Sequence, residues 1–157
     1  GVPVTLNVRG ICCLRPGVPG LTDNIQVFSI VGRFLEHPRV YAFGVGEGTR
    51  VYIGSADMMT RNTERRVEIA CPVLDPAVRA QILRDMEIYR ADNVKARILQ
   101  PDGSYVKADR PEGVPAVDAQ AAFMERALSE AEAAALTPPA PERRPGLLAR
   151  LFGRREK

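Results

Sequence analysis

Residues 37–62 read HPRVYAFGVGEGTRVYIGSADMMTRN, and this stretch decides the fold. Two β-rich runs, at 40–44 and 50–55, lie on either side of a Gly-Glu-Gly turn at 46–48. Runs of this kind separated by a short glycine-containing turn are typical of a β-hairpin. The stretch therefore predicts two antiparallel strands with a tight turn between them.

The register of this hairpin predicts which side chains meet at its open end. If the turn centres on Glu47, His37 lies opposite Asp57 and Arg39 lies opposite Ser55, to within about two residues. His37 and Arg39 are two positions apart, so their side chains leave the same face of the strand. The open end is then expected to gather basic and polar side chains: His37, Arg39, Ser55, Asp57, Arg61, Asn62, Arg65 and Arg66.

On either side of the hairpin, predicted strands alternate with predicted helices. Strands are expected at 4–8, 66–73, 94–99 and 105–107, the last two joined by a turn at 101–104. One helix is expected to begin with Asp75 as its N-cap and to end near Arg90, and another to span 117–136. The inward residues of the helix that follows Asp75 are expected to be Val78, Ile82, Met86 and Tyr89. This order of elements, with hairpins among them, predicts an α/β fold with a mixed sheet.

A third helix is predicted just before the hairpin. Asp23 and Gln26 have the spacing of a capping box. Apolar residues follow at helical spacing: Val27, Ile30, Val31 and Phe34. Pro38 disfavours helical geometry at the residue before it, so this helix is expected to end at or before His37.

Length and composition narrow the class of protein. The chain has 157 residues, of which 45% are hydrophobic, and this suits one domain with a real core. No apolar run is long enough for a transmembrane helix, and no secretory signal opens the chain. Three cysteines are too few for a disulfide framework or a zinc site. The first residue is Gly1, and a predicted strand follows almost at once, so we expect a piece of a longer chain.

The last 21 residues, 137–157, have a different composition. The segment 137–145 is rich in proline and arginine and predicts a disordered linker. Residues 146–157 are basic and weakly amphipathic, so they are interpreted either as a solvated tail or as a weak contact with a membrane surface.

The basic residues at the strand ends favour phosphate as a ligand. Arginine forks match phosphate oxygens, and a histidine can donate or accept a proton near neutral pH. Arg9 also follows a predicted strand, and Gly10 after it allows a ligand close to the backbone. A solvated turn in which Glu64 and Glu68 pair with the neighbouring arginines is the other interpretation. From these residues alone, the sequence predicts a phosphate-binding α/β domain.

Three segments resemble one known family. Residues 8–17 (VRGICCLRPG), 29–37 (SIVGRFLEH) and 52–62 (YIGSADMMTRN) closely resemble the C-terminal domain of bacterial polyphosphate kinase. The resemblance implies a phospholipase D-like α/β fold, a mixed sheet flanked by helices and truncated at its N-terminus. Residues 1–136 would form the second phospholipase D-like domain, and 137–157 a disordered tail.

The resemblance also implies an activity and roles for residues. The family reversibly transfers the terminal phosphate of ATP to inorganic polyphosphate, through a phosphohistidine in the preceding domain, which is absent here. His37 is implied to contact nucleotide phosphates and to act as a general acid, and Arg9 and Arg66 to contact phosphate. The supporting residues would be Arg39, Ser55, Asp57, Arg61 and Asn62. No metal ligand is expected in this chain, because the Mg²⁺ that accompanies ATP would be held outside it.

The expected partners follow from the same resemblance. They are ATP or ADP, polyphosphate, the missing N-terminal domains of the same chain and further copies in a homo-oligomer, with no specific nucleic acid. The location would be cytoplasmic, with a peripheral contact at the inner membrane through the tail. The isolated 157-residue chain is expected to be inactive. Two alternatives remain open: a phospholipase D-like phosphodiesterase, and a non-catalytic polyanion-binding module, which the pI of about 9.0 favours.

Overall fold

The computed structural model describes residues 1–136, in two compact units that divide between Met124 and Glu125. The elements in order are β1 (Val4–Asn7), β2 (Ile25–Ile30), β3 (Val40–Phe43), a 3₁₀ turn (Gly46–Gly48), β4 (Arg50–Gly54), α1 (Thr60–Arg65), β5 (Ala70–Pro72), α2 (Pro76–Ala91), β6 (Ala96–Leu99), β7 (Tyr105–Lys107) and α3 (Ala119–Leu136). The predicted α/β class with mixed strand directions is confirmed.

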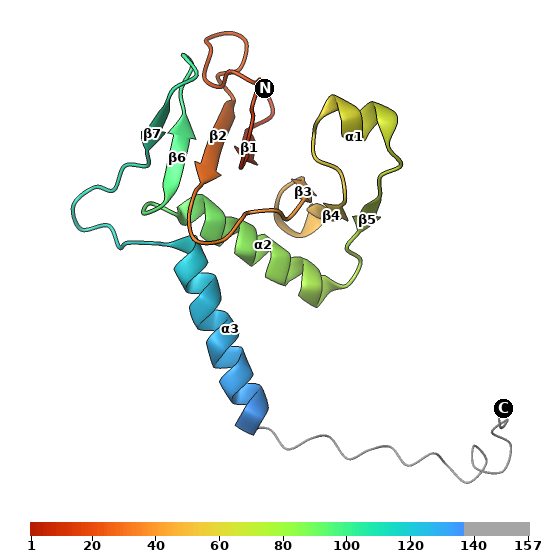
Figure 1. The fold of residues 1–157 in the computed structure, drawn as a ribbon, viewed down its shortest axis with the longest axis vertical. Coiled ribbons are helices and arrows are strands. Elements are labelled where there is room, and N and C mark those ends of the chain that lie inside the picture. The colour runs from red at the N-terminus through yellow and green to blue at the C-terminus, as the bar shows by residue number, and fades with distance from the viewer. Residues whose placement is uncertain (137–157) are drawn as a thin grey trace, which may run out of the picture. The chain divides into compact units, whose positions relative to one another are not determined.

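The first unit contains two sheets, which are separate groups of strands in Figure 1. In the four-stranded sheet the order is β1-β2-β6-β7, with β1 parallel to β2 and the other neighbours antiparallel. Phe28, Ile30, Ala96 and Ala119 form the buried cluster on this sheet. Partly buried residues of the two long helices pack against that cluster: Ile88, Tyr89 and Phe123.

The helix predicted after Asp23 is wrong, because the structure forms β2 there. Residues 27–30 are all buried, and β2 lies between β1 and β6. A central strand covered on both faces has a continuous apolar run, which in a short segment cannot be told from one face of a helix. The Asp23 carboxylate accepts from Gly20 N at 3.3 Å within the preceding turn, and so does not cap a helix.

The predicted hairpin is confirmed as β3 and β4, which β5 extends to a three-stranded sheet. Gly44 and Gly46 have φ of 104° and 59°, a backbone conformation that favours glycine. Val40 pairs with Ile53, so the ladder is shifted by one residue from the predicted centre. Gly54, and not Ser55, therefore donates its N–H to Arg39 O, at 2.8 Å.

The remaining elements differ from the prediction mainly at their ends. β5 covers only Ala70–Pro72 of the expected 66–73. α1 continues to Arg65 with Arg66 as its C-cap, and residues 67–69 belong to no strand. Asp75 caps α2 as predicted, since its Oδ1 accepts from Ala77 N at 2.8 Å and Val78 N at 2.9 Å. Of the four side chains expected to face inward on α2, Val78 is 48% exposed and the other three are partly buried.

The second unit begins at Glu125 and contains the end of α3. There Arg126 Nε lies 3.9 Å from Glu130 Oε1, one turn along the helix. No helix within residues 1–136 is long and apolar enough to cross a membrane. The tail predicted at 137–157 lies outside the described residues.

Candidate functional site

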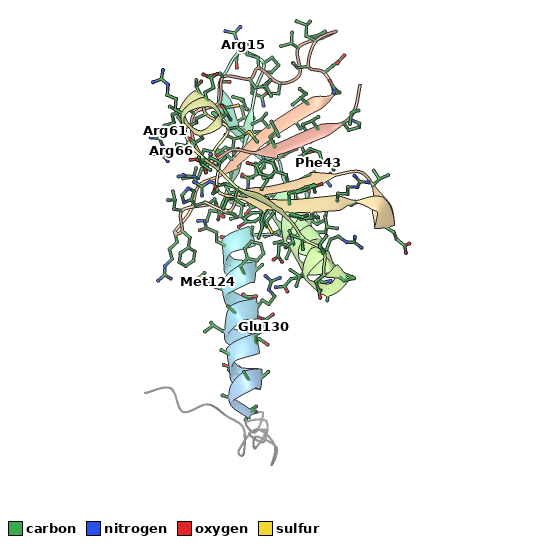
Figure 2. The ribbon with its side chains drawn as sticks, turned by 90° about the vertical axis from the view of Figure 1, so that its right-hand side faces the viewer. Arg15, Phe43, Arg61, Arg66, Met124 and Glu130 are labelled. Atoms are coloured by element: carbon green, nitrogen blue, oxygen red, sulfur yellow. The ribbon has the colours of Figure 1, made fainter. Side chains whose placement is uncertain are left out.

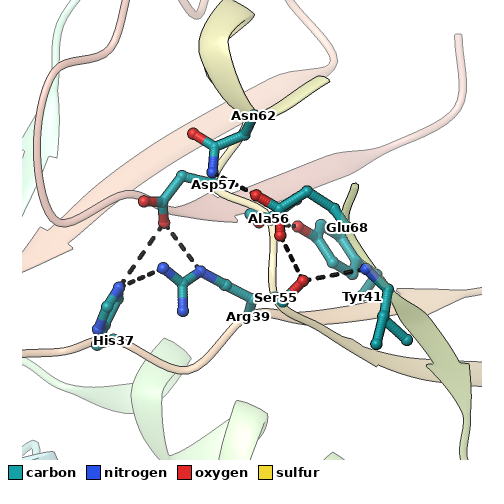
Figure 3. Close-up of polar contacts among 9 residues, drawn as sticks. His37, Arg39, Tyr41, Ser55, Ala56, Asp57, Asn62 and Glu68 are labelled. Carbon is teal, nitrogen blue, oxygen red and sulfur yellow. Dashed lines mark hydrogen bonds and ion pairs between the residues drawn. The ribbon is translucent and has the colours of Figure 1, made fainter. Parts of the chain in front are cut away.

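His37, Arg39 and Asp57 meet at the open end of the hairpin (Figure 3). Arg39 Nε donates to Asp57 Oδ1 at 3.0 Å, and His37 Nε2 lies 4.0 Å from the same oxygen. A terminal nitrogen of Arg39 also contacts His37 Nε2. The His37 side chain is 46% exposed, whereas those of Arg39 and Asp57 are 23% and 27% exposed. The histidine is therefore the member of this cluster most open to a ligand.

The contact between Arg39 and His37 determines which ring nitrogen carries the proton in this arrangement. A guanidinium can only donate, so His37 Nε2 must accept. The proton of the neutral ring is then on Nδ1, which remains the donor of the imidazole. Arg39 thus holds the orientation and the tautomer of His37, while Asp57 holds Arg39.

Charge around Asp57 comes from both sheets. The hydrogen bond from Arg39 lowers the pKa of the Asp57 carboxyl, against an opposing effect of burial, and the charges of Arg39, Arg9 and His37 lower it further. Arg9 lies just after β1, in the four-stranded sheet, so that sheet also contributes positive charge to the cluster. A Cβ at Gly10 would meet nothing within 4 Å, which leaves open space beside the backbone.

Ser55 and Asn62 bind Glu68 instead of His37 or Arg39. Ser55 Oγ donates to Glu68 Oε2 and accepts from Ile69 N at 3.0 Å, and Asn62 Nδ2 donates to Glu68 Oε1 at 2.7 Å. These two hydrogen bonds, Ser55 first, lower the pKa of Glu68. Asn62 is only 3% exposed, and its Oδ1 has no partner among the described residues. The two residues therefore support the chain around α1 and β5.

The predicted arginines of this region are exposed. Arg61 lies in the first turn of α1 and Arg66 is its C-cap, and both are labelled in Figure 2. The charge of Arg66 contributes to the lowered pKa of Glu68, so the two charges interact. The alternative pairing of Glu68 with the arginines is thus only partial, because its hydrogen bonds come from Ser55 and Asn62.

Sequence reasoning missed a hydrogen-bonded group next to His37. It consists of Glu36, the residue before His37, with Tyr89 and Gln120, which both bind Glu36. Tyr89 OH donates to Glu36 Oε2 at 2.6 Å, and Gln120 Nε2 donates to Glu36 Oε1, also at 2.6 Å. Burial, the hydrogen bond to Glu36 and its charge raise the pKa of Tyr89, so its hydroxyl remains a donor. One signal was available, because a tyrosine predicted on the inward face of a helix needs a partner for its hydroxyl.

The described residues offer no cluster of three or more His, Cys, Asp or Glu side chains that could hold a metal ion. Three carboxylates of this region already bind other side chains: Asp57 binds Arg39, Glu68 binds Ser55 and Asn62, and Glu36 binds Tyr89 and Gln120. These side chains therefore do not fit a resident Mg²⁺.

Known proteins are similar to this chain in both sequence and fold. Residues 1–120 match the family described as "Polyphosphate kinase C-terminal domain 2". The chain is 48% identical over 127 residues to a polyphosphate kinase of Lactiplantibacillus plantarum, covering 81% of this chain and 18% of the relative. Against polyphosphate kinase 1 of Chlorobaculum tepidum the identity is 47% over 128 residues, with 80% and 18% covered.

A crystal structure of polyphosphate kinase from Porphyromonas gingivalis matches with a TM-score of 0.75 and 40% identity, covering 82% of this chain and 20% of that one. The chain thus spans about a fifth of the length of the relatives it matches. The sequence motifs, the two sheets and these matches agree, and the chain belongs to the polyphosphate kinase family.

Proposed function

We propose that residues 1–136 are the second C-terminal domain of an intact polyphosphate kinase, with 137–157 as a separate tail. The intact enzyme transfers the terminal phosphate of ATP to inorganic polyphosphate, reversibly, through a phosphohistidine in the preceding domain. This domain contributes contacts to the phosphates. The family membership and the names of the relatives support the reaction, and the geometry at the hairpin supports the role of this domain.

The observation that carries the proposal is the cluster of Arg9, His37, Arg39 and Asp57. Asp57 offsets the charge of Arg39 through a hydrogen bond of 3.0 Å. The charge of Arg9, which also acts on Asp57, is therefore available to an anion. The cluster is partly exposed and contains an open imidazole. Phosphoryl transfer needs positioning and charge stabilisation more than covalent help from the protein. This cluster can provide both.

Each residue then has a chemical task. Arg9 and Arg66 bind phosphate oxygens and offset the negative charge that spreads over the transferred group. As the terminal phosphorus bonds to the histidine of the preceding domain and its bond to the bridging oxygen breaks, His37 acts from its imidazolium form. It donates the Nε2 proton to the oxygen that leaves with ADP and becomes the neutral ring that accepts from Arg39. Arg39 keeps the imidazole in place, and Asp57 keeps Arg39 in place. In the reverse reaction His37 takes the proton back.

The partners of the intact enzyme are proposals of the same kind. ATP enters as its Mg²⁺ complex, so the metal belongs to the substrate. ADP, polyphosphate and the remaining domains of the same chain complete the site, in a homo-oligomer located in the cytoplasm. Contact of the tail with the inner membrane remains a prediction about residues outside the described part.

The test compares the intact enzyme with variants at His37. We expect His37→Ala to lower kcat for polyphosphate formation from ATP by about 100-fold or more, the usual cost of losing a general acid. His37→Gln keeps a similar volume and should be equally impaired. Arg50→Ala removes an exposed arginine at the turn end of the hairpin and serves as the matched control, with activity unchanged.

Three outcomes would contradict the proposal in different ways. Full activity of His37→Ala would remove His37 from the mechanism. Hydrolysis of a chromogenic phosphodiester by a folded wild type that makes no polyphosphate would favour the phosphodiesterase. Salt-sensitive binding of DNA and polyphosphate alike, unchanged in His37→Ala and without turnover, would favour the polyanion-binding module.

A further inference from the structure

The amide of Gln120 holds the backbone of the segment that carries His37. Gln120 is 4% exposed and lies in the first turn of α3. Its Oε1 accepts from Phe34 N at 3.1 Å, and its Nε2 donates to Phe34 O at 2.9 Å and to Glu36 Oε1 at 2.6 Å. Both donor hydrogens and the acceptor oxygen of this amide are therefore used on two residues just before His37.

The carboxylate of Glu36 receives a second donor from another helix. Tyr89 OH, on α2, donates to Glu36 Oε2 at 2.6 Å. The Tyr89 ring packs edge-on against Phe123, with 4.9 Å between the ring centroids. The residue next to His37 is thus bound by side chains from α2 and α3, both of which pack on the buried core.

Gly32 shows how closely this amide packs against the segment. A Cβ at Gly32 would lie 2.3 Å from Gln120 Oε1 and 2.8 Å from its Cδ. No positive φ restricts this glycine, so the amide of Gln120 is the obstacle to a larger residue. The fit between Gly32 and Gln120 provides a second way to disturb the same contact.

We propose that Gln120, and Tyr89 acting through Glu36, are positioning residues for His37. The inference rests on the proposed function, because it concerns the proton transfer assigned to His37. Residues 31–39 belong to no helix or strand, so side-chain contacts must set their path. Displacing a catalytic group by about 1 Å can cost on the order of 100-fold in rate. A buried amide with every polar group engaged is suited to prevent such a displacement.

The experiment uses the intact enzyme and measures kcat and KM for ATP in polyphosphate formation. We expect Gln120→Leu and Tyr89→Phe each to lower kcat by about 10-fold or more. KM should change by less than about twofold, because the arginines that bind phosphate are untouched. The matched controls lie in the β6–β7 hairpin. Gln100→Leu removes a hydrogen bond to Ile98 O, and Tyr105→Phe removes the hydroxyl of a residue that is 43% exposed. Both variants should keep wild-type kinetics.

A double-mutant cycle with His37→Ala separates positioning from structure. If Gln120 acts through His37, adding Gln120→Leu to His37→Ala should cause no further loss of kcat. A merely structural role would lower kcat by the same factor in both backgrounds and would overturn the proposal. Wild-type kcat in Gln120→Leu would overturn it as well.

Two further variants keep the proposal testable if Gln120→Leu does not fold. Gly32→Ala leaves Gln120 in the chain but displaces its amide, and it should reproduce the kcat loss, again only when His37 is present. Tyr89→Phe removes a single hydroxyl and keeps the ring. Full activity of both variants would contradict the proposal. Failure of the proposed function is recognised separately, because His37→Ala alone would then leave polyphosphate synthesis unchanged.

Discussion

Replacing Asp92 should destabilise the first unit more than replacing any exposed cap. Asp92 follows α2 and is 4% exposed. Its Oδ1 accepts from Val94 N at 3.0 Å, Lys95 N at 2.7 Å and Ala96 N at 3.0 Å, and its Oδ2 accepts from Ala119 N at 2.8 Å. One carboxylate therefore joins the end of α2, the start of β6 and the start of α3.

The loss in the free energy of unfolding follows from these four hydrogen bonds. A hydrogen bond to a charged group contributes roughly 1.5–3 kcal/mol, and a buried donor left without a partner costs roughly 1–3 kcal/mol. Asp92→Asn keeps an acceptor for three of the donors but places an NH₂ group against Ala119 N, so we expect a loss of about 2 kcal/mol. Asp92→Ala leaves all four donors unpaired, and because two of them are only partly buried we use the low end, about 1 kcal/mol each. The expected loss is then about 4 kcal/mol, a large share of the roughly 5–15 kcal/mol of a typical domain.

The assay is urea unfolding of the 157-residue chain, followed by circular dichroism. Asp75→Ala is the matched control, because Asp75 is an exposed cap with two backbone bonds, and its loss should cost about 1 kcal/mol. An Asp92→Ala variant no less stable than Asp75→Ala would refute the reasoning. It would mean that the four N–H groups find water or other acceptors when the carboxylate is removed.

Two further predictions concern the pH dependence of stability and the activity of the isolated chain. The lowered pKa of Asp57 means that its hydrogen bond to Arg39 stabilises the fold fully above pH 3.8, and that this contribution is lost as the pH falls through the lowered value. NMR titration of the carboxyl group should show the lowered pKa. Arg39→Leu should return that pKa toward 3.8. An Asp57 midpoint unchanged by Arg39→Leu would exclude the hydrogen bond as the main cause. The isolated chain should neither make nor degrade polyphosphate, because the phosphohistidine of the proposed reaction lies in another domain, and robust synthesis from ATP would contradict this.

The hairpin end was predictable because local rules determine it. The turn at 46–48 and the period of two along the strands brought His37, Arg39 and Asp57 together, even with the register shifted by one residue. β2 was not predictable in this way, since its pairing with β1 and β6 decides between strand and helix. The contacts of Gln120 were also out of reach, because they join positions 86 and 84 residues apart. No local spacing encodes them.

The three strands of the smaller sheet are inserted in the sequence between β2 and β6 of the four-stranded sheet. The chain leaves after β2 and returns along α2 to β6, and the hydrogen bonds of Tyr89 and Gln120 to Glu36 close the two ends of this path. Within residues 37–72 Val51 is the only buried apolar side chain, and all of β5 is exposed. The core cluster lies on the other sheet. Low burial of apolar side chains is typical of segments with low local stability, so residues 37–72 are expected to open more readily than β2 and β6. His37 is the first residue of this segment, so its opening would separate His37, Arg39 and Asp57 while the four-stranded sheet stays folded.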